Sequence, residues 1–212
     1  MPQELRERFA ELAERVGALD NLPLEQWHRL YERAVAAAPD MIIEVGRGYG
    51  NSTVVLTEAA HELGVRVYSV GNDVPPTFAN ITWGKLRPVV GEAWRSPLIL
   101  IQGDVRDYKP FECERAFLFW DAHGPEVAET MLKRLIPALP RGSTVVVHDV
   151  CTPQEAAEYP VEADPARGIP HGYPYSWNGF VSPFEELPLL GAWLDERGIE
   201  PEYDTWMLAF RL

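Results

Sequence analysis

The feature that most constrains the fold is a strand, a glycine-rich turn and a helix, predicted in direct succession between Met41 and Ala60. Met41 to Val45 is a short apolar run, typical of a strand buried on both faces, with a carboxylate, Glu44, near its carboxyl end. Glycines follow at three alternate positions, and the next residues, Asn51-Ser52-Thr53, can each cap a helix. Glycine lets the backbone bend sharply here and approach a ligand without a Cβ in the way.

The spacing of these glycines bears on the kind of ligand. A dinucleotide-binding turn reads G-x-G-x-x-G and would need a glycine at position 51, where this chain has Asn51. The pattern present, E-x-G-x-G-x-G, resembles motif I of the class I methyltransferases that use S-adenosylmethionine. In that family the loop holds a ligand with a cationic amino-acid end and no phosphate, which suits a carboxylate at Glu44. The alternative is an ordinary glycine-rich surface turn.

The resemblance implies that the cofactor contacts the strand end, the turn and the helix start. The expected contacts are Glu44, Gly46, Gly48, Tyr49, Gly50, Asn51 and Ser52.

Size, charge and cysteine content narrow the functional classes. A chain of 212 residues is long enough for one α/β domain with a sizeable core. With 32 acidic against 19 basic residues the net charge is −13, which repels phosphate backbones and argues against nucleic acid as the main partner. Two cysteines form neither a disulfide framework nor a zinc pattern. No apolar run is long enough for a membrane span and the start does not resemble a signal peptide, so we expect a cytoplasmic protein without a membrane partner.

Two helices are predicted before the glycine turn, in a helical cap over residues 1–40. Apolar residues from Leu5 to Val16 recur at helical spacing, and a second apolar stripe runs from Leu24 to Ala38, where Pro39 ends the helix. We expect these helices to cover an edge of the sheet; the alternative is that they form the surface of a homodimer.

Two further strand ends resemble the cofactor-binding segments of the same family. A strand over 65–70 leads into Gly71-Asn72-Asp73, where the family usually has an acidic residue that binds the ribose hydroxyls. Gly71 stands at the usual position, so Asp73 is the expected ribose ligand, with Asn72 as a substitute. A strand over 98–101 leads into Gly103, Asp104 and Val105, which resemble the segment that lines the adenine; a plain turn is the alternative. The connection over 74–97 is rich in proline and is expected to be partly irregular, with a short helix near 89–94.

The next two strands also end in polar residues. Ala116 to Trp120 runs into Asp121-Ala122-His123-Gly124, and after a helix over 125–139, Thr144 to Val147 runs into His148-Asp149. The alternation of helices and buried strands predicts a doubly wound, mostly parallel sheet with helices on both faces, a Rossmann-like methyltransferase fold. Ligands bind at the carboxyl ends of the strands in such sheets. The cofactor-binding core is therefore expected over 41–150, with Asp121 among the cofactor contacts.

Asp121, His148 and Asp149 are expected to meet at this edge and form a divalent-metal site. Carboxylates suit magnesium, whereas the imidazole favours manganese, iron or zinc. The pattern resembles the metal-dependent O-methyltransferases and their cephalosporin-hydroxylase-like relatives, whose acidic residues at these strand ends hold magnesium. His148-Asp149 departs from the usual pair, which is Asp-Asp, Glu-Asp or Asp-Asn. Catechol-type relatives carry a Lys where this chain has Gly124, which excludes a Lys base.

Residues 159–184, the lid segment, are rich in proline and aromatic residues. Regular structure is not expected there, but the aromatic residues indicate that the segment packs on something, as a lid or substrate loop does. A final helix over 183–197 and a strand over 203–211 complete a single domain, with residues 185–212 as its C-terminal part.

The resemblance predicts an S-adenosylmethionine-dependent methyltransferase that acts on a hydroxyl of a small molecule, such as a sugar, a polyketide or a phenolic compound. His123, with an imidazole that titrates near neutral pH, is the expected base beside Asp121, and a metal could activate the hydroxyl instead. His171 in the lid segment is another candidate base. Alternatives are a nicotinamide-dependent oxidoreductase, which Asn51 and Gly71 disfavour, and a non-catalytic module, in which Arg47 or Tyr49 would block the turn.

Overall fold

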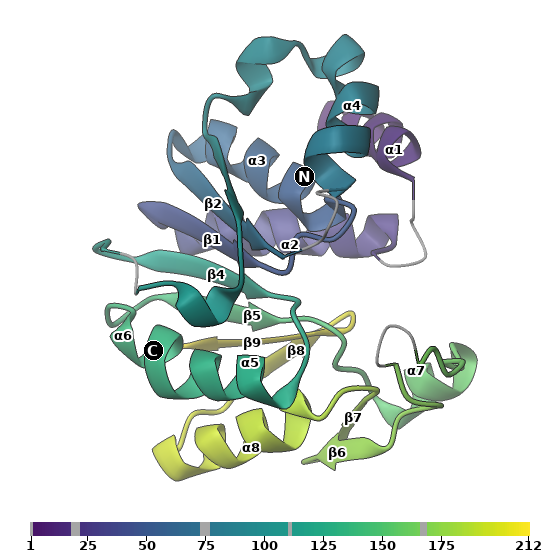
Figure 1. Ribbon diagram of the computed structural model, residues 1–212, viewed down its shortest axis with the longest axis vertical. Helices are drawn as coiled ribbons and strands as arrows, with labels where there is room; N and C mark the ends of the chain where they lie inside the picture. Colours follow the sequence, from purple (N-terminus) through teal and green to yellow (C-terminus); the bar gives the residue numbers. More distant parts are fainter. Residues whose placement is uncertain (1, 18–21, 73–76, 110–111, 166–168) are drawn as a thin grey trace.

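The computed structural model describes residues 2–17, 22–72, 77–109, 112–165 and 169–212 (Figure 1). Its centre is a seven-stranded sheet in the order β3-β2-β1-β4-β5-β9-β8. Strands β1 to β5 are mutually parallel, and β9 and β8 add an antiparallel hairpin at the β5 side. The prediction of a doubly wound, mostly parallel sheet is confirmed. The strands of this sheet are β1 (Met41–Val45), β2 (Arg66–Gly71), β3 (Leu98–Gln102), β4 (Ala116–Trp120), β5 (Thr144–Val147), β8 (Glu202–Asp204) and β9 (Met207–Arg211).

Helices connect the strands and cover both faces of the sheet. The α-helices are α1 (Gln3–Val16), α2 (Leu24–Ala37), α3 (Asn51–Leu63), α4 (Trp83–Val90), α5 (Pro125–Thr130), α6 (Ile136–Ala138), α7 (Pro153–Glu158) and α8 (Glu186–Arg197). Two π-helical turns, η1 (Phe78–Thr82) and η4 (Met131–Leu135), precede α4 and α6, and two 3₁₀ turns are η2 (Glu92–Arg95) and η3 (Val105–Asp107). None of the described helices is long and apolar enough to cross a membrane.

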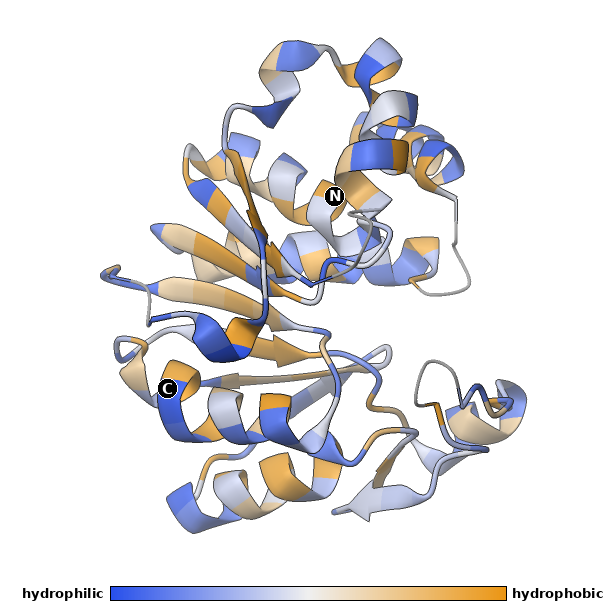
Figure 2. Cartoon of the chain, in the orientation of Figure 1, coloured by the Kyte–Doolittle hydropathy of each residue, from blue (hydrophilic) through white to orange (hydrophobic). Residues whose placement is uncertain are grey.

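The two faces of the sheet have separate cores because side chains alternate along each strand. In β4, Phe117 and Phe119 pack on the side of α1 to α4, whereas Leu118 and Trp120 pack on the side of α5 and α8. The central strands of the sheet are accordingly drawn mostly in hydrophobic colours in Figure 2, and hydrophilic residues lie on the outer helices. A strand of this kind has almost no polar position until it ends, so the polar residues gather at its carboxyl end.

The two N-terminal helices complete one face of the sheet and do not merely cover an edge. Phe9 of α1 makes edge-to-face contacts with Trp27 and Tyr31 of α2, with ring centroids 5.9 and 5.4 Å apart. Arg33 of α2 forms ion pairs with Glu202 and Asp204 of β8, at 3.2 and 3.5 Å. Helix α2 therefore spans the face from α3 to the last strand, and its first turn reaches the carboxyl edge of the sheet.

The lid segment contains regular structure that the sequence analysis did not predict. Strands β6 (Tyr175–Trp177) and β7 (Phe180–Ser182) form an antiparallel hairpin. Its turn residues, Asn178 and Gly179, both have positive φ, of 47° and 84°, as a type I′ turn requires. The predicted final strand is likewise a hairpin, β8 and β9, and the predicted irregular connection is mostly helical, through η1, α4 and η2.

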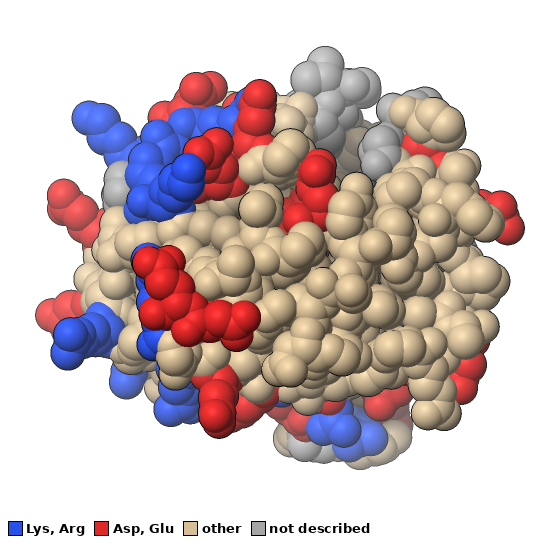
Figure 3. Space-filling model, turned by 90° about the horizontal axis from the view of Figure 1, so that it is seen from below, with Lys and Arg blue, Asp and Glu red and all other residues tan. Residues whose placement is uncertain are grey.

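Figure 3 shows the molecule from the side of α8 and the β6–β7 hairpin. Acidic and basic side chains are mixed toward one end of this face, and a broad area at the other end carries few charges. Leu189 of α8 is among the exposed large apolar residues of the chain, at 43 % exposure.

Candidate functional site

A cavity of about 850 Å³ lies at the carboxyl edge of the sheet. Its walls come from the start of α2, from the glycine turn, from the ends of β2 to β5, from the lid segment and from the β8–β9 turn. Residues lining it include Leu22, Glu25, Gln26, Gly46, Arg47, Gly48, Tyr49, Gly50, Asn51, Ser52, Asn72, Gly103, Asp104, Val105, Asp121, His123, His148, Asp149, Glu158, Tyr159, Ile169, Tyr173, Phe184, Thr205 and Trp206. Most of the residues predicted from sequence to form the site therefore share one cavity.

The glycine turn needs glycine for different reasons at its three positions. Gly46 has φ +97°, and a Cβ there would lie 2.0 Å from the carbonyl oxygen of Asp121. Gly50 has φ +94°, and a Cβ there would lie 2.1 Å from the ring of Phe78. Gly48 has φ +47° with nothing within 4 Å of the Cβ position. The first and third glycines hold the turn tightly against its neighbours, and the middle one leaves space at the cavity wall.

Glu44 does not line the cavity, contrary to its predicted role as a cofactor contact. Its side chain is fully buried behind the turn, where it accepts hydrogen bonds from Ser52 at 2.6 Å, from Thr53 at 2.7 Å and from Ser69. Burial raises the pKa of Glu44, although these three hydroxyl groups oppose the shift. The carboxylate therefore fixes the start of α3 to β1 and β2 and acts on the turn from behind.

Arg47 and Tyr49, the two side chains between the glycines, do not fill the turn. The Arg47 guanidinium lies across the ends of β2 and β3 and donates to the carbonyl oxygen of Ser69 at 2.8 Å and to Oε1 of Gln102 at 3.0 Å. Tyr49 is 48 % exposed at the rim. The blocked turn expected of a non-catalytic module is not what the structure shows.

The residues that follow β2 and β3 form the next part of the cavity wall. Asn72, Gly103, Asp104 and Val105 all line the cavity, whereas Asp73 lies outside the described residues. Asp104 is held by Arg106, whose guanidinium donates to both its oxygens, at 2.9 and 2.6 Å. This interaction is the main reason that the pKa of Asp104 lies below its usual range.

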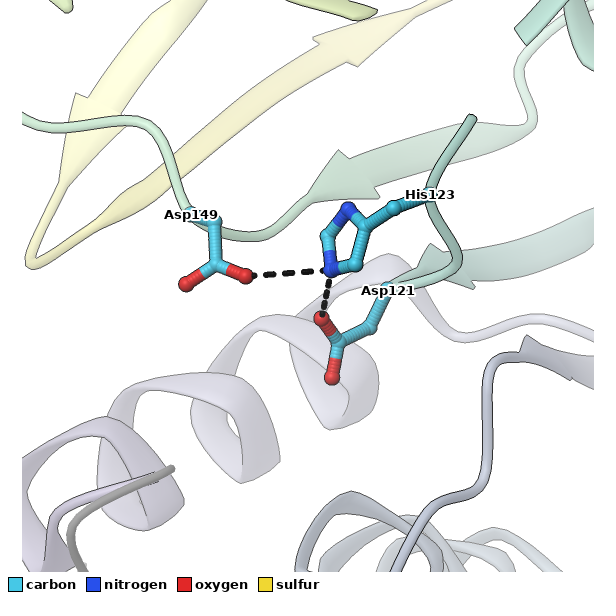
Figure 4. A group of neighbouring side chains, drawn as sticks. All are labelled: Asp121, His123 and Asp149. Carbon is cyan, nitrogen blue, oxygen red and sulfur yellow. Dashed lines mark ion pairs between the residues drawn. The ribbon is translucent and has the colours of Figure 1, made fainter. Parts of the chain in front are cut away.

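A cluster of two carboxylates and an imidazole follows at the ends of β4 and β5. Figure 4 shows His123 between Asp121 and Asp149, with one ring nitrogen directed at both carboxylates. His123 Nε2 lies 3.3 Å from Asp149 Oδ2 and 3.6 Å from Asp121 Oδ1. One ligand atom from each of the three residues lies within 4.8 Å of the others, close enough to hold a metal ion.

His148 was predicted to be the imidazole of this metal site, and the structure places it beside Asp121 and Asp149 together with a second imidazole, His123. The Nε2 atom of His148 donates to Oε1 of Gln26 in α2 at 2.8 Å, and its Nδ1 lies 3.3 Å from both Asp121 and Asp149. Both ring nitrogens are thus engaged, and His148, although largely buried, lines the cavity and orients the two carboxylates. His123, predicted as a base, meets the same two carboxylates, so the cluster contains two imidazoles.

Glu186, at the start of α8, belongs to the cluster and was missed from the sequence. Its Oε1 lies 3.4 Å from His123 Nδ1 and accepts a hydrogen bond from the backbone NH of Gly124 at 2.5 Å. The ring of Phe184 stacks on the His123 ring, with centroids 3.4 Å apart and planes at 10°. His123 is therefore fixed from three sides, and no local sequence signal links α8 to the end of β4.

The electrostatics of the cluster are dominated by its carboxylates. Burial by itself lowers the pKa of His123, but Asp149, Glu186 and Asp121 outweigh it and raise the pKa to about 10. The pKa of His148 also lies well above its usual value, because Asp149 and Asp121 outweigh burial. Burial opposes ionisation of Asp149, yet His148 and His123 hold its pKa well below the usual range. The carboxylates therefore favour the protonated form of both imidazoles.

Two carboxylates and an imidazole form a donor set that suits a divalent transition metal better than magnesium. Since a metal needs the neutral imidazole, binding at His123 would release its proton. His171, the other candidate base, is 76 % exposed, does not line the cavity and lies 4.0 Å from Glu162.

No protein-family model and no curated protein matches the chain, but many solved structures do. The methyltransferase PaMTH1 of Podospora anserina, bound to S-adenosylhomocysteine (SAH), is 18 % identical with a TM-score of 0.64, covering 100 % of this chain and 88 % of its own. The O-methyltransferase of Bacillus cereus, in complex with SAH, is 16 % identical with a TM-score of 0.59, covering 100 % and 92 %. The O-methyltransferase TomG of Streptomyces achromogenes, in complex with S-adenosylmethionine (SAM), is 16 % identical with a TM-score of 0.59. The match covers 100 % of this chain and 91 % of TomG. The chain therefore has the class I methyltransferase fold that the glycine pattern predicted.

Proposed function

We propose that the protein is a SAM-dependent methyltransferase that methylates a hydroxyl of a small molecule, in the class of a sugar, a polyketide or a phenolic compound. The observation that carries this proposal is that one cavity contains both the glycine turn and the Asp121–His123–Asp149 cluster. A methyl donor at the turn and an acceptor oxygen at the cluster would then share one enclosed space. Proximity and orientation of this kind are what a group transfer mainly needs from an enzyme.

The cavity volume and the open glycine turn support the proposed cofactor site. The cavity of about 850 Å³ is within the range of natural small-ligand sites, roughly 300–1,000 Å³. Gly48 leaves the wall open, and the first turn of α3 begins at Asn51 beside it. Asn72 lines the cavity, and we propose that its side chain donates to and accepts from the ribose hydroxyls. When bound, SAM supplies an electrophilic methyl group on a sulfonium.

The cluster is proposed to hold and activate the acceptor hydroxyl. Asp121 and Asp149 would accept its hydrogen bond and direct the oxygen lone pair toward the methyl group. As the O–CH3 bond forms and the S–CH3 bond breaks, Asp121 would take the hydroxyl proton and SAH would leave. His123 was predicted to be the base, but with a pKa of about 10 it already holds a proton at neutral pH. A divalent cation, if held by Asp121, His123 and Asp149, would lower the pKa of the acceptor hydroxyl. His123 is then proposed as a ligand, and Glu186 keeps its ring in place.

Cofactor binding is tested by calorimetric titration with SAM and SAH. We expect micromolar binding to the parent and none to Gly48→Asp, because the new side chain would enter the open space at the cavity wall. Gly64→Asp is the matched control: it lies at the far end of α3, has a similar φ of +69° and also has free space around the Cβ position. If Gly48→Asp binds SAH as tightly as Gly64→Asp does, the cofactor site is wrongly placed.

The metal is tested separately with manganese alone. Calorimetry should show Mn²⁺ binding to the parent and its loss in Asp149→Asn, while both proteins bind SAH equally. Chelation should then remove SAH production from SAM without releasing the cofactor. Turnover that is insensitive to the chelator would eliminate the metal role and leave the methyltransferase proposal standing.

The proposal also covers the partners and the location of the protein. The partner is a small-molecule acceptor, with neither nucleic acid nor membrane involved, and the location is cytoplasmic. Homodimer formation remains a prediction of the sequence analysis.

A further inference from the structure

Three aromatic side chains form one end of the cavity, where the lid segment meets the β8–β9 turn. The Trp206 ring makes edge-to-face contact with Tyr159, with centroids 5.9 Å apart at 83°, and contacts Tyr173 at 5.8 Å and 60°. The Tyr173 hydroxyl donates to the Tyr159 carbonyl oxygen at 2.6 Å. All three residues line the cavity, and Tyr159 is still 62 % exposed. These residues, the aromatic wall, therefore present ring surface to whatever occupies that end.

The turn that carries Trp206 is unusual for its sequence. Strands β8 and β9 remain paired up to Asp204 and Met207, so only Thr205 and Trp206 connect them. Both have positive φ, of 49° and 66°. A two-residue hairpin of this kind prefers Asn-Gly, and a positive φ at a β-branched or bulky residue is a backbone outlier.

The other hairpin of the chain has the sequence that this turn prefers. The β6–β7 hairpin, whose turn does not line the cavity, uses Asn178-Gly179 with φ of 47° and 84°. The β8–β9 hairpin has the same geometry with residues that disfavour it. Such residues persist where the surrounding structure determines them and are concentrated at ligand sites.

Neighbouring groups hold Trp206 in register with the cluster. Its backbone NH donates to the Tyr203 hydroxyl at 3.1 Å, and its carbonyl oxygen accepts from the NH of Val150 at 3.3 Å. Val150 follows Asp149 directly, so the indole is tied to the backbone that presents one of the two proposed acceptor-binding carboxylates. The turn positions a flat apolar surface at a fixed place relative to the reacting oxygen.

We infer that Trp206, supported by Tyr159 and Tyr173, determines acceptor specificity by stacking on a planar aromatic ring that carries the hydroxyl. This inference rests on the proposed function and narrows its acceptor class to uncharged aromatic hydroxyl compounds. Carboxylates of Glu25 and Glu158 also line the cavity, and the guanidinium of Arg47 is engaged by Ser69 and Gln102. Among the described lining residues, the carboxylates outnumber the cations, which disfavours an anionic acceptor; the carboxylates are Glu25, Asp104, Asp121, Asp149 and Glu158, and the cations are Arg47, His123 and His148.

The test uses a variant that separates recognition from stability. Thr205→Asn/Trp206→Gly installs the favoured turn and removes the indole, so its thermal unfolding midpoint should not fall, while aromatic binding is lost. The probe is 2,3-dihydroxynaphthalene, and its matched control is cis-cyclohexane-1,2-diol, which has two vicinal hydroxyls without a ring face. We expect the parent to bind the aromatic probe about tenfold more tightly than the control, and the double variant to lose that difference, in line with typical stacking contributions.

Two single variants and the affinity for SAH serve as controls. Thr205→Asn alone should keep the preference, and Trp206→Phe should restore most of it, with SAH affinity unchanged in all variants. Equal affinity of the parent for both probes overturns the inference. An unchanged preference in the double variant also overturns it, whatever the unfolding temperature of that variant. Failure of the parent to bind SAH would overturn the proposed function instead, because probe affinity is also measured without the cofactor.

Discussion

Gln26 and His148 are 122 positions apart in the chain, yet the Gln26 Oε1 atom accepts a hydrogen bond from His148 Nε2 at 2.8 Å in a buried position. Since His148 contacts both Asp121 and Asp149, this bond makes the first turn of α2 a part of the candidate active site. The N-terminal helices thus act on the geometry of the cluster as well as on the core.

Gln26→Ala should therefore destabilise the protein. The substitution leaves the buried N–H of His148 without an acceptor, which costs about 1–3 kcal/mol of unfolding free energy. Gln26→Glu retains an acceptor at the same place and should lose less. Urea unfolding of the three proteins measures the differences, and equal stability of Gln26→Ala and the parent would show that the bond has no energetic weight.

Gly46→Ala should be much more damaging than Gly48→Ala. At position 46 the Cβ would meet the Asp121 carbonyl oxygen at 2.0 Å, so β1 and β4 would have to separate locally. At position 48 only the left-handed backbone conformation opposes alanine, at a cost of about 1 kcal/mol. Thermal unfolding of both variants checks the order. A Gly46→Ala protein as stable as Gly48→Ala would contradict the close approach of the two strand ends.

Glu44→Gln should become more favourable, relative to the parent, as the pH rises. The folded state raises the pKa of Glu44, so between the ordinary value of about 4.3 and the raised value it binds more protons than the unfolded state. The stability contributed by this group is then lost with increasing pH, whereas glutamine does not titrate. The unfolding free energies of both proteins, measured from about pH 4 to pH 8, show how their difference changes with pH. A difference that stays constant, or moves the other way, would count against the raised pKa.

Asp149→Asn should lower the pKa of His123. Asp149 makes the largest contribution to raising that pKa to about 10, and the amide keeps the shape of the side chain without its charge. Titration of the imidazole ring protons by NMR, in the presence of a chelator, should show the transition moving toward the ordinary value of about 6.5. Asp40→Asn, at the opposite edge of the sheet, serves as the control and should leave the His123 transition where it is.

The strands of the core could be predicted because their sequences leave little choice. Met41–Val45, Ala116–Trp120 and Thr144–Val147 are apolar runs too short for helices, and the structure begins and ends these three strands at the predicted residues. The lid hairpin could also have been found, since Asn178-Gly179 between aromatic residues is a strong hairpin signal. The number of prolines in the lid segment obscured that signal.

The contacts of the two imidazoles could not be assigned from adjacency in the sequence. His148 and Asp149 follow β5, but Asp149 has φ +59°, so the alternation of a strand does not continue there and His148 Nδ1 lies 3.3 Å from Asp149 Oδ1. The His148 ring lies 6.0 Å from Phe119 and is hydrogen-bonded to Gln26, and both His148 and Asp149 line the cavity. The partners Gln26 and Glu186 reach the site through long-range packing alone, so no local pattern could have indicated them.

The cavity walls come from segments scattered along the chain, from the start of α2 to the turn before β9. A compound that bridges them would bind only the intact assembly, so it should delay melting of the whole molecule and not of one part. At a concentration one hundred times its dissociation constant, such a compound adds about 2.7 kcal/mol to the unfolding free energy. Melting-temperature screens of metabolite libraries can therefore identify the natural acceptor before any assay for its conversion exists.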